Sequence, residues 1–451
     1  MTEFSVGSSA LVFGLGAAGA SLARALSSRG VELLLADDSA NDSHQALADE
    51  LNAPLAISPN EAVLRNMANQ VEMVCPSPGV PLMSHPVYVA AQATNRPVVG
   101  ELDLAAAWDS RPIVAVTGTD GKTTVTTLVS MMINADGRRC MPVGNTDTPL
   151  VDALATNLDV FAVEASSFRL RFCTVFAPQS AVFVNFAPDH LNWHPSLDDY
   201  RDAKARIWTA QSSDSIAIGN AADPVVMRCL ERATGRHQSF GAGGEFVVRD
   251  AVLWAHGERV LAVADMPRSF PHDVDNALAA CGAVLGIGVG LDSVRKVLSE
   301  FSGLEHRMAL VGTVDAVRYY DDSKATSPHA VLTALRSFDD VVLIAGGRNK
   351  GLDLTELSLE HQRVRGVVAI GDAAGEVVSA FAGLAPTVVA HSMSEAVHCA
   401  HMFAKVGGQR LPVLLSPACT SYDWYANYHE RGNDFIACVR ALAYEKGMGA
   451  E

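Results

Sequence analysis

Short runs of hydrophobic residues recur along the chain, separated by longer segments whose hydrophobic positions repeat with the period of a helix. In the first half, runs of strand length are Ala10–Phe13, Val31–Ala36, Val71–Cys75, Ile113–Thr117, Val160–Glu164 and Ser180–Asn185. After about residue 305 the alternation resumes with Val317–Tyr320, Val341–Ala345, Gly366–Ile370 and Pro412–Ser416. This alternation predicts repeated βαβ units with mostly parallel sheets, which is an α/β fold.

Two breaks interrupt the pattern. The first lies near Trp108–Arg111, where the helical segment Gly100–Trp108 ends just before a strand. The second lies near Ser302–His306, after the helical segment Asp292–Phe301. A chain of 451 residues is long enough for about three domains. We therefore predict domains at residues 1–109, 110–304 and 305–451.

A first glycine-rich loop follows the strand Ala10–Phe13 and precedes a helix. The segment Gly14-Leu15-Gly16-Ala-Ala-Gly19 matches the dinucleotide-binding fingerprint, and Asp37 and Asp38 close the next strand. Glycines let a pyrophosphate approach the helix N-terminus, while an acidic residue accepts from a sugar hydroxyl. Taken alone, the loop indicates NAD, and its alternative is a tight turn that binds nothing. A further loop, Ser77-Pro78-Gly79, is placed to close the same crevice.

A second glycine-rich loop, residues 117–124, lies between the strand Ile113–Thr117 and a helix that runs through Met132. Backbone N–H groups and a lysine ammonium suit triphosphate oxygens, and a threonine hydroxyl suits magnesium. The strict P-loop pattern has glycine where this chain has Val116, and a chance turn rich in glycine and threonine is the alternative. We take ATP as the ligand. The loop consists of Gly118, Thr119, Asp120, Gly121, Lys122, Thr123 and Thr124.

Charge and cysteine content narrow the function further. With 34 Lys and Arg against 50 Asp and Glu, the formal charge is −16, which disfavours nucleic-acid binding through a basic face. The eight cysteines show no Cys-x-x-Cys pair and no zinc spacing, so we interpret them as small buried hydrophobic residues. The chain start lacks the features of a secretory signal, and its longest uncharged stretch is too short to span a membrane. We expect a soluble, cytoplasmic monomer.

The two phosphate-binding loops lie about a hundred residues apart and need a joint explanation. A dehydrogenase needs the first loop and no triphosphate loop, whereas a motor or switch ATPase needs only the second. An enzyme that binds a nucleotide-linked substrate in one domain and ATP in the next needs both.

Taken in order, the motifs resemble those of the Mur ligases of bacterial peptidoglycan synthesis, and the last three blocks resemble the glutamate-adding members. The landmarks are Gly14-Leu15-Gly16, Ser77-Pro78-Gly79, residues 117–124, Glu164-Ala165-Ser166-Ser167-Phe168, Asp189-His190, Lys204, His306-Arg307, Asp322-Ser323-Lys324-Ala325-Thr326, residues 346–351 and residues 415–421.

The resemblance implies ATP-driven amide formation. A substrate carboxylate takes the γ-phosphoryl group, and the amine of glutamate then displaces phosphate from the acyl phosphate. The expected substrates are UDP-N-acetylmuramoyl-L-alanine and glutamate, with D-glutamate as the first choice. The implied architecture is a Rossmann-like N-terminal domain for the UDP part, a central P-loop ATPase-like domain and a Rossmann-like C-terminal domain for glutamate.

The resemblance also assigns roles to individual residues. Catalysis falls to Lys122, His190 and Lys204, and Lys204 matches a family lysine that is carbamylated. Two magnesium ions would be held by Thr123, Glu164, His190 and Lys204. Outside the phosphate loop, ATP contacts are Asn276, Arg307, Asp322 and Lys324. Substrate contacts are Gly14, Leu15, Gly16, Asp37, Ser77, Pro78, Gly79, Asn145, Ser166, His190, Thr326, Lys350, Ser421, Tyr422 and Tyr428.

Several positions depart from the family pattern. Asp120 replaces the usual Asn of the phosphate loop, residues 146–148 read Thr-Asp-Thr, Asp273 stands where Asn is common, and Tyr428 replaces a Phe. These departures leave L-glutamate open as the acceptor.

Other interpretations also remain at this stage. A sister ligase of the folylpolyglutamate type shares the ATP loop but not the first glycine-rich loop. A dehydrogenase and a catalytically silent nucleotide-binding protein are further alternatives. Judged singly, Glu164 is an ordinary edge charge, His190 a turn histidine and Lys204 a helix-surface lysine.

Overall fold

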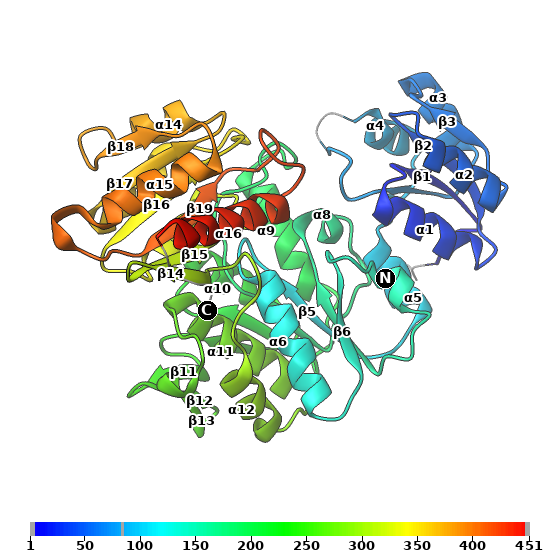
Figure 1. Cartoon of the computed structure of the whole chain (residues 1–451). Helices are drawn as coiled ribbons and strands as arrows, with labels where there is room; N and C mark the ends of the chain where they lie inside the picture. The colour runs from blue at the N-terminus through cyan, green and yellow to red at the C-terminus, as the bar shows by residue number, and fades with distance from the viewer. Residues whose placement is uncertain (1–4, 83–84, 447–451) are drawn as a thin grey trace. The chain divides into compact units, whose positions relative to one another are not determined.

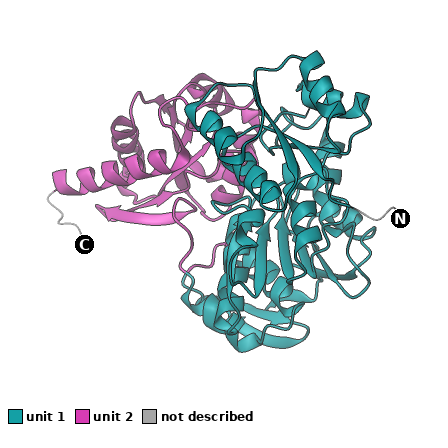
Figure 2. Cartoon of the chain, turned by 90° about the vertical axis from the view of Figure 1, so that its right-hand side faces the viewer, with its two compact units in different colours: residues 1–267, 274–301 teal, residues 268–273, 302–451 magenta. Residues whose placement is uncertain are grey.

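A computed structural model describes residues 5–82 and 85–446 and confirms the α/β fold (Figure 1). The chain divides into two compact units, which Figure 2 colours separately. Unit 1 comprises residues 1–267 and 274–301, and unit 2 comprises residues 268–273 and 302–451.

The first sheet of unit 1 has four parallel strands in the order β3-β2-β1-β4. Its central strand, β1, is almost entirely buried, because helices cover both of its faces. The strands are β1 Ser9–Phe13, β2 Glu32–Asp37, β3 Leu55–Ile57 and β4 Met73–Pro76, and the helices are α1 Ala17–Ser27, α2 Asp42–Leu51, α3 Glu61–Asn69, α4 Pro86–Ala93 and α5 Glu101–Trp108.

The second sheet of unit 1 has nine strands in the order β13-β12-β11-β10-β9-β8-β5-β7-β6, parallel except for the β11–β12–β13 meander. The strands are β5 Ile113–Thr117, β6 Cys140–Gly144, β7 Val160–Glu164, β8 Ser180–Phe183, β9 Ile216–Asn220, β10 Arg236–Phe240, β11 Phe246–Arg249, β12 Val252–Ala255 and β13 Glu258–Ala262. The helices and 3₁₀ turns are α6 Lys122–Ala135, α7 Leu150–Ala153, α8 Ser167–Leu170, α9 Leu197–Ala205, η1 Arg206–Trp208, α10 Pro224–Leu230, η2 Val263–Asp265, α11 Pro271–Leu285 and α12 Leu291–Glu300.

Strand β5 is the structural centre of this sheet. Val114 and Val116 face the hydrophobic cluster that includes α6, while Ile113 and Ala115 face the cluster on the opposite side. Strands β7 and β8 flank β5 in parallel, so the carboxyl ends of all three lie at one edge of the sheet. That edge is where open α/β sheets bind their ligands.

Unit 2 contains a six-stranded sheet in the order β14-β15-β19-β16-β17-β18, parallel except for the β14–β15 pair. Helices α13 and α14 cover one face, and α15 and α16 cover the other. The elements are β14 Ala309–Val314, β15 Val317–Asp321, α13 Pro328–Leu335, β16 Val341–Gly346, η3 Leu354–Arg363, β17 Val364–Ile370, α14 Ala374–Ala380, β18 Thr387–Val389, α15 Met393–Ala404, η4 Val406–Gly408, β19 Val413–Ala418 and α16 Tyr428–Glu445.

The predicted strands are present with small shifts at their ends. Strands β5 and β7 have the predicted bounds, whereas β8 ends at Phe183, so Asn185 lies in the following loop. Strands β3, β6, β9–β14 and β18 were outside the prediction. One of them, β10, is mostly polar and partly exposed, so it shows no hydrophobic run.

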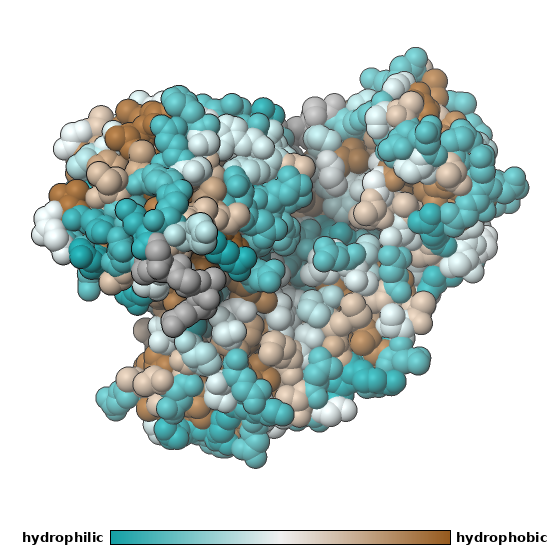
Figure 3. All heavy atoms as spheres, viewed as in Figure 1, coloured by the Kyte–Doolittle hydropathy of each residue, from teal (hydrophilic) through white to brown (hydrophobic). Residues whose placement is uncertain are grey.

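The cysteine prediction holds for six of the eight residues, while Cys399 and Cys438 are only half-buried. On the face shown in Figure 3, hydrophilic residues predominate and hydrophobic ones are scattered. Over residues 5–82 and 85–446, no helix combines the length and the apolar character needed to cross a membrane.

Candidate active site

The second glycine-rich loop links β5 to α6 and is built as a phosphate cradle. Gly121 caps α6 with a left-handed backbone (φ +81°), and a Cβ placed there would lie 2.6 Å from Oδ1 of Asn276. Only glycine therefore lets Asn276, an expected ATP contact, approach the loop this closely. The loop leads directly into the N-terminus of α6, where backbone N–H groups favour an anion.

Asn185, which the sequence analysis missed, holds the shape of this loop. Its side-chain oxygen accepts from the backbone N–H of Thr119 at 3.1 Å and of Asp120 at 2.9 Å. Its side-chain nitrogen donates to the Asp120 carbonyl at 3.2 Å. Because Asn185 comes from the loop after β8, only the strand order β8-β5 brings it to the phosphate loop. Nothing near it in sequence signals this contact.

Two lysines meet at one carbonyl of the phosphate loop. Lys122 donates to the carbonyls of Gly118 and Thr119 at 2.9 and 2.8 Å, and Lys204 of α9 donates to Gly118 at 2.5 Å. Lys204 is 1% exposed. Burial, followed by the positive charge of Lys122, lowers the pKa of Lys204 well below its usual value. Lys204 is therefore a buried lysine with a lowered pKa rather than the helix-surface lysine of the alternative interpretation.

Glu164, at the end of β7, is 3% exposed. Its Oε1 accepts from the side-chain amide of Asn145 at 2.9 Å, whereas its Oε2 is buried without a hydrogen-bond partner in the described structure. Burial of a carboxylate oxygen without a hydrogen-bond partner costs free energy unless a bound ligand interacts with that oxygen. The site therefore suits a cation, and Asn145 orients the carboxylate that would hold it.

His190 has a strained backbone conformation. Its backbone lies in the left-handed region (φ +56°), its amide donates to Asp189 at 2.8 Å, and its ring packs edge-on against Phe168 at 4.7 Å. Strain of this size in a residue other than glycine is typical of functional sites. Among the residues that the structure describes, no three His, Cys, Asp or Glu side chains form a metal-binding group by themselves. A magnesium site here therefore needs hydroxyl, phosphate or modified-lysine oxygens as well.

The first glycine-rich loop is held by Asp37. The Asp37 carboxylate accepts from the backbone N–H of Leu15 at 2.6 Å and of Ser39 at 2.9 Å. Burial tends to raise the pKa of Asp37, but these amide hydrogen bonds together outweigh it, so the pKa lies below the ordinary value. Asp37 thus organises the loop through Leu15, in addition to any contact with a sugar.

The Ser77-Pro78-Gly79 loop contacts the second sheet's loops through Val80. The Val80 carbonyl accepts from the indole N–H of Trp193 at 2.9 Å and from the hydroxyl of Tyr88 at 3.0 Å. Trp193 also packs against Phe168 at 4.7 Å, and Phe168 contacts His190. An aromatic cluster therefore joins the predicted UDP-substrate loop to His190.

In unit 2, Asp322 and Lys324 follow β15. Asp322 accepts from the Ser416 hydroxyl at 2.8 Å and from the backbone N–H of Met308 at 3.3 Å. Burial raises the pKa of Asp322 to about 7, against the lowering effects of Ser416 and Arg307. The Lys324 ammonium lies 3.7 Å from the ring centroid of Tyr428, a cation–π contact between two predicted ligand-binding residues.

One arginine, missed by the sequence analysis, lies behind three loops of unit 2. Arg431 of α16 is 1% exposed and donates to the Ser323 carbonyl at 2.8 Å and to the Cys419 carbonyl at 3.1 Å. A Cβ on Gly347 would lie 3.0 Å from its Nη1. These three loops carry the predicted glutamate contacts Thr326, Lys350 and Ser421.

The predicted glutamate contacts differ in exposure. Ser421 is buried, Thr326, Lys350 and Tyr428 are half-buried, and Tyr422 is 63% exposed. Burial of arginine without a directly bonded carboxylate lowers the pKa of Arg431 to about 10. The site in unit 2 thus combines a buried cation with accessible hydroxyl and ammonium donors, which is a suitable environment for an anionic amino acid.

Two family models match the chain in consecutive segments. Residues 116–284 match the Mur ligase middle domain, and residues 306–419 match the Mur ligase glutamate ligase domain. A UDP-N-acetylmuramoylalanine--D-glutamate ligase of Frankia casuarinae is 39% identical, covering 96% of this chain and 93% of its own length. This chain belongs to the Mur ligase family. The match confirms the predicted ligase class.

Further relatives of this Mur ligase carry the same name. The UDP-N-acetylmuramoylalanine--D-glutamate ligase of Thermobifida fusca is 36% identical, covering 96% of this chain and 98% of its own length. Among solved structures, the MurF ligase of Thermotoga maritima in complex with ADP has a TM-score of 0.61 at 15% identity, covering 96% of this chain and 98% of its own. A pseudomurein peptide ligase type C from Methanothermus fervidus has a TM-score of 0.58 at 15% identity, covering 97% and 99%. These structures confirm the fold of the Mur ligase.

Proposed function

We propose that the chain is an ATP-dependent ligase that joins D-glutamate to UDP-N-acetylmuramoyl-L-alanine in peptidoglycan synthesis. The names of its relatives support the substrates, and the phosphate loop with its two lysines supports the use of ATP. We further propose that the enzyme acts as a monomer in the cytoplasm.

The work divides among three domains. Residues 1–109 bind the UDP substrate through the loops at Gly14–Gly16 and Ser77–Gly79, which Asp37 and Trp193 hold in place. Residues 110–304 bind ATP. Residues 305–451 bind glutamate through Thr326, Lys350, Ser421, Tyr422 and Tyr428, with Arg431 behind them. The ATP contacts Asn276 and Arg307 belong to different units, so the reaction requires a domain closure about the connection near residue 305.

Magnesium would be held by Thr123, Glu164, His190 and carbamylated Lys204. When bound, it supplies charge neutralisation for the triphosphate oxygens. The orphaned Oε2 of Glu164 supports such a site. The lowered pKa of Lys204 favours its deprotonated amine, which can add to CO₂ with release of a proton to give a carbamate whose anionic oxygens would hold the metal.

In the reaction, the protein's own groups orient the reactants and supply positive charge. Lys122 and the loop amides orient the γ-phosphoryl group for in-line attack by the substrate carboxylate, which releases ADP and leaves an acyl phosphate. His190 lies beside that path. The glutamate amine attacks the acyl carbon, loses a proton and displaces phosphate, so that one amide bond forms for each ATP consumed. Arg307 and Lys324 add positive charge where phosphate is released.

The observation that carries this proposal is the convergence of Lys122, Lys204 and the phosphate loop at the carbonyl of Gly118. The test is ADP release from magnesium-ATP and UDP-N-acetylmuramoyl-L-alanine with D-glutamate, L-glutamate or no acceptor. Turnover with D-glutamate that is lost in Lys122→Ala is the expected result. A preference for L-glutamate would keep the mechanism and change the acceptor, and no turnover from folded protein would refute the proposal.

A further inference from the structure

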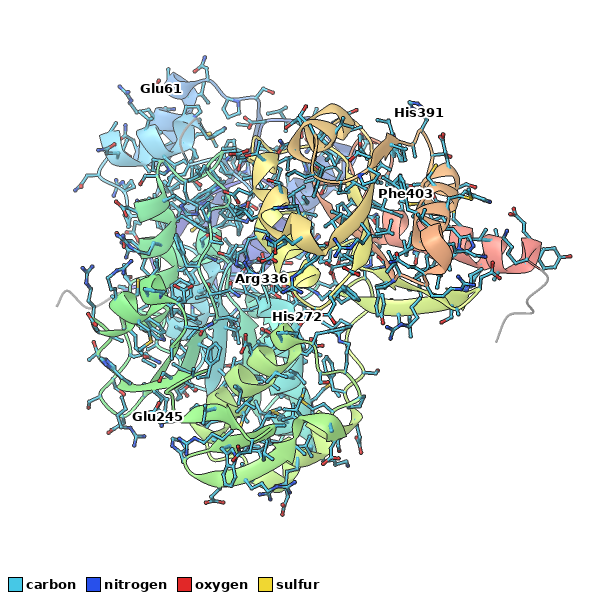
Figure 4. The ribbon with its side chains drawn as sticks, turned by 90° about the vertical axis from the view of Figure 1, so that its left-hand side faces the viewer. Glu61, Glu245, His272, Arg336, His391 and Phe403 are labelled. Atoms are coloured by element: carbon cyan, nitrogen blue, oxygen red, sulfur yellow. The ribbon has the colours of Figure 1, made fainter. Side chains whose placement is uncertain are left out.

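Six residues between η2 and the body of α11 belong to unit 2, although unit 1 surrounds them in sequence. The segment 268–273 includes His272, which Figure 4 labels. Phe270 explains this placement, because its ring packs against Tyr320 at 6.0 Å and Phe338 at 5.8 Å, inside a hydrophobic cluster of unit 2. The N-terminus of α11 is thus anchored in one unit, and the rest of the helix continues in the other.

Arg268 and Asp273 form a forked ion pair within this segment. Nε and Nη2 of Arg268 donate to the two carboxylate oxygens of Asp273 at 2.8 and 2.5 Å, and both side chains are largely buried. Asp273 also accepts from the backbone N–H of Phe270 at 3.2 Å. This geometry uses two of the five N–H groups of the guanidinium and leaves Nη1 for another partner.

The remaining nitrogen binds the connection to unit 2. Nη1 of Arg268 donates to the carbonyl of Arg307 at 2.6 Å, and its distance to the carbonyl of Met308 is 3.4 Å. Gly303 lies against the same guanidinium, since a Cβ there would be 2.5 Å from Nη1. One side chain therefore binds both segments that cross between the units, at residues 268–273 and 302–308.

The pair lies next to two predicted ATP contacts. The backbone carbonyl of Arg307 accepts the hydrogen bond from Arg268, and Asn276 lies one helical turn after Asp273 on α11. Within unit 1, Asn276 reaches Gly121 of the phosphate loop. Hydrogen bonds thus link the Arg307 carbonyl to Arg268 and Arg268 to Asp273, and one turn of α11 leads from Asp273 to Asn276, which lies close to Gly121.

We propose that Arg268 and Asp273 are a positioning pair for ATP, which set the backbone of Arg307 relative to the start of α11. The inference rests on the proposed use of ATP. A guanidinium fork suits this role because it bonds a carboxylate and a carbonyl at once, which an ammonium does with poorer geometry. The ion pair with Arg268 also explains why Asp273 stands where Asn is common in the family.

The test is binding of a non-hydrolysable ATP analogue with magnesium to the full chain, measured by calorimetry, together with KM values. Arg268→Gln should raise the Kd of the analogue and the KM for ATP about tenfold and leave the KM for glutamate unchanged. Arg268→Lys should restore part of the affinity. Asp273→Asn, which keeps the shape of the side chain, should weaken binding less, and the double variant should show effects that do not add.

Arg295 offers a matched control in unit 1. It pairs with Asp292 at 2.8 Å and donates to the backbone carbonyls of Arg259 and Val260, so it shares the carboxylate and carbonyl partners of Arg268 but lies in a more exposed ion pair. Arg295→Gln should leave ATP affinity unchanged. If Arg268→Gln lowers the melting temperature but not the affinity for the analogue, the pair is only structural and the inference is wrong. Loss of analogue affinity in Arg268→Gln but no ligase turnover in wild type would instead refute the proposed function alone.

Discussion

Asp322 makes the stability of unit 2 depend on pH in a direction unusual for a carboxylate. Its pKa rises from an ordinary value near 3.8 to about 7 on folding, because the side chain is buried. Between these two values the folded protein keeps a proton that the unfolded chain has released. The unfolding free energy therefore falls as pH rises, by about 1.4 kcal/mol per pH unit and about 4 kcal/mol in all.

Asp322→Asn removes this titration and keeps the neutral shape. The asparagine oxygen can accept from the backbone N–H of Met308, and its amide nitrogen, in the place of the second carboxylate oxygen, can donate to the Ser416 hydroxyl. We expect the variant to match wild type below about pH 4, to exceed it by about 1.6 kcal/mol near pH 5 and to exceed it by about 4 kcal/mol near pH 8. Other titrating groups are shared by the two proteins, so they cancel in the difference.

Calorimetric unfolding from about pH 5 to about pH 8 would measure this difference, with the transition of unit 2 followed separately because a chain of two units need not unfold in one step. Asp339→Asn is the control, since Asp339 lies in the same unit and is exposed. A stability difference between Asp322→Asn and wild type that stays constant across this range would refute the buried, raised-pKa carboxylate.

Three further predictions concern the site itself. Asn145→Ala should raise the magnesium concentration needed for half-maximal turnover by about tenfold, because Glu164 loses the amide that orients it; unchanged magnesium dependence would contradict this role. Lys204→Arg should remove the carbamate carbon signal that ¹³C-bicarbonate gives in wild type, and turnover should fall about a thousandfold, since arginine keeps the charge but does not form the carbamate. Arg431→Lys should raise the KM for glutamate about tenfold while the KM for ATP stays within about twofold, as one ammonium does not bridge the three loops; equal changes in both constants would show a general loss of structure.

The sequence predicted the features that depend on neighbouring residues. The phosphate loop is one example, because its glycines, lysine and threonine lie in a single turn between a hydrophobic strand and a helix; β5 has the predicted bounds, and α6 runs through Met132 as expected. The α/β class followed in the same way from the alternation of strand and helix periods. Strands such as β10 were missed because a polar, partly exposed strand carries no such signal.

The residues that hold the site in shape come from distant parts of the chain. Asn185 reaches the phosphate loop from the loop after β8, 65 residues away from Asp120, and Arg431 reaches Ser323 across 108 residues. Their own sequence surroundings are ordinary, so no local pattern distinguishes them. The same holds for Arg268, whose partner carbonyl at Arg307 lies 39 residues further on.

Burial is a second property that the tertiary structure shows and the sequence does not. The sequence alone placed Lys204 and Asp322 in a site by resemblance, but their altered pKa values arise from exclusion of water, which depends on how helices and strands pack around them. By itself the sequence determined which chemical groups this chain carries and which local loops hold phosphate. Only the tertiary structure decided which of those groups meet and how each is charged, because parallel strand order and packing bring together residues that the chain keeps far apart.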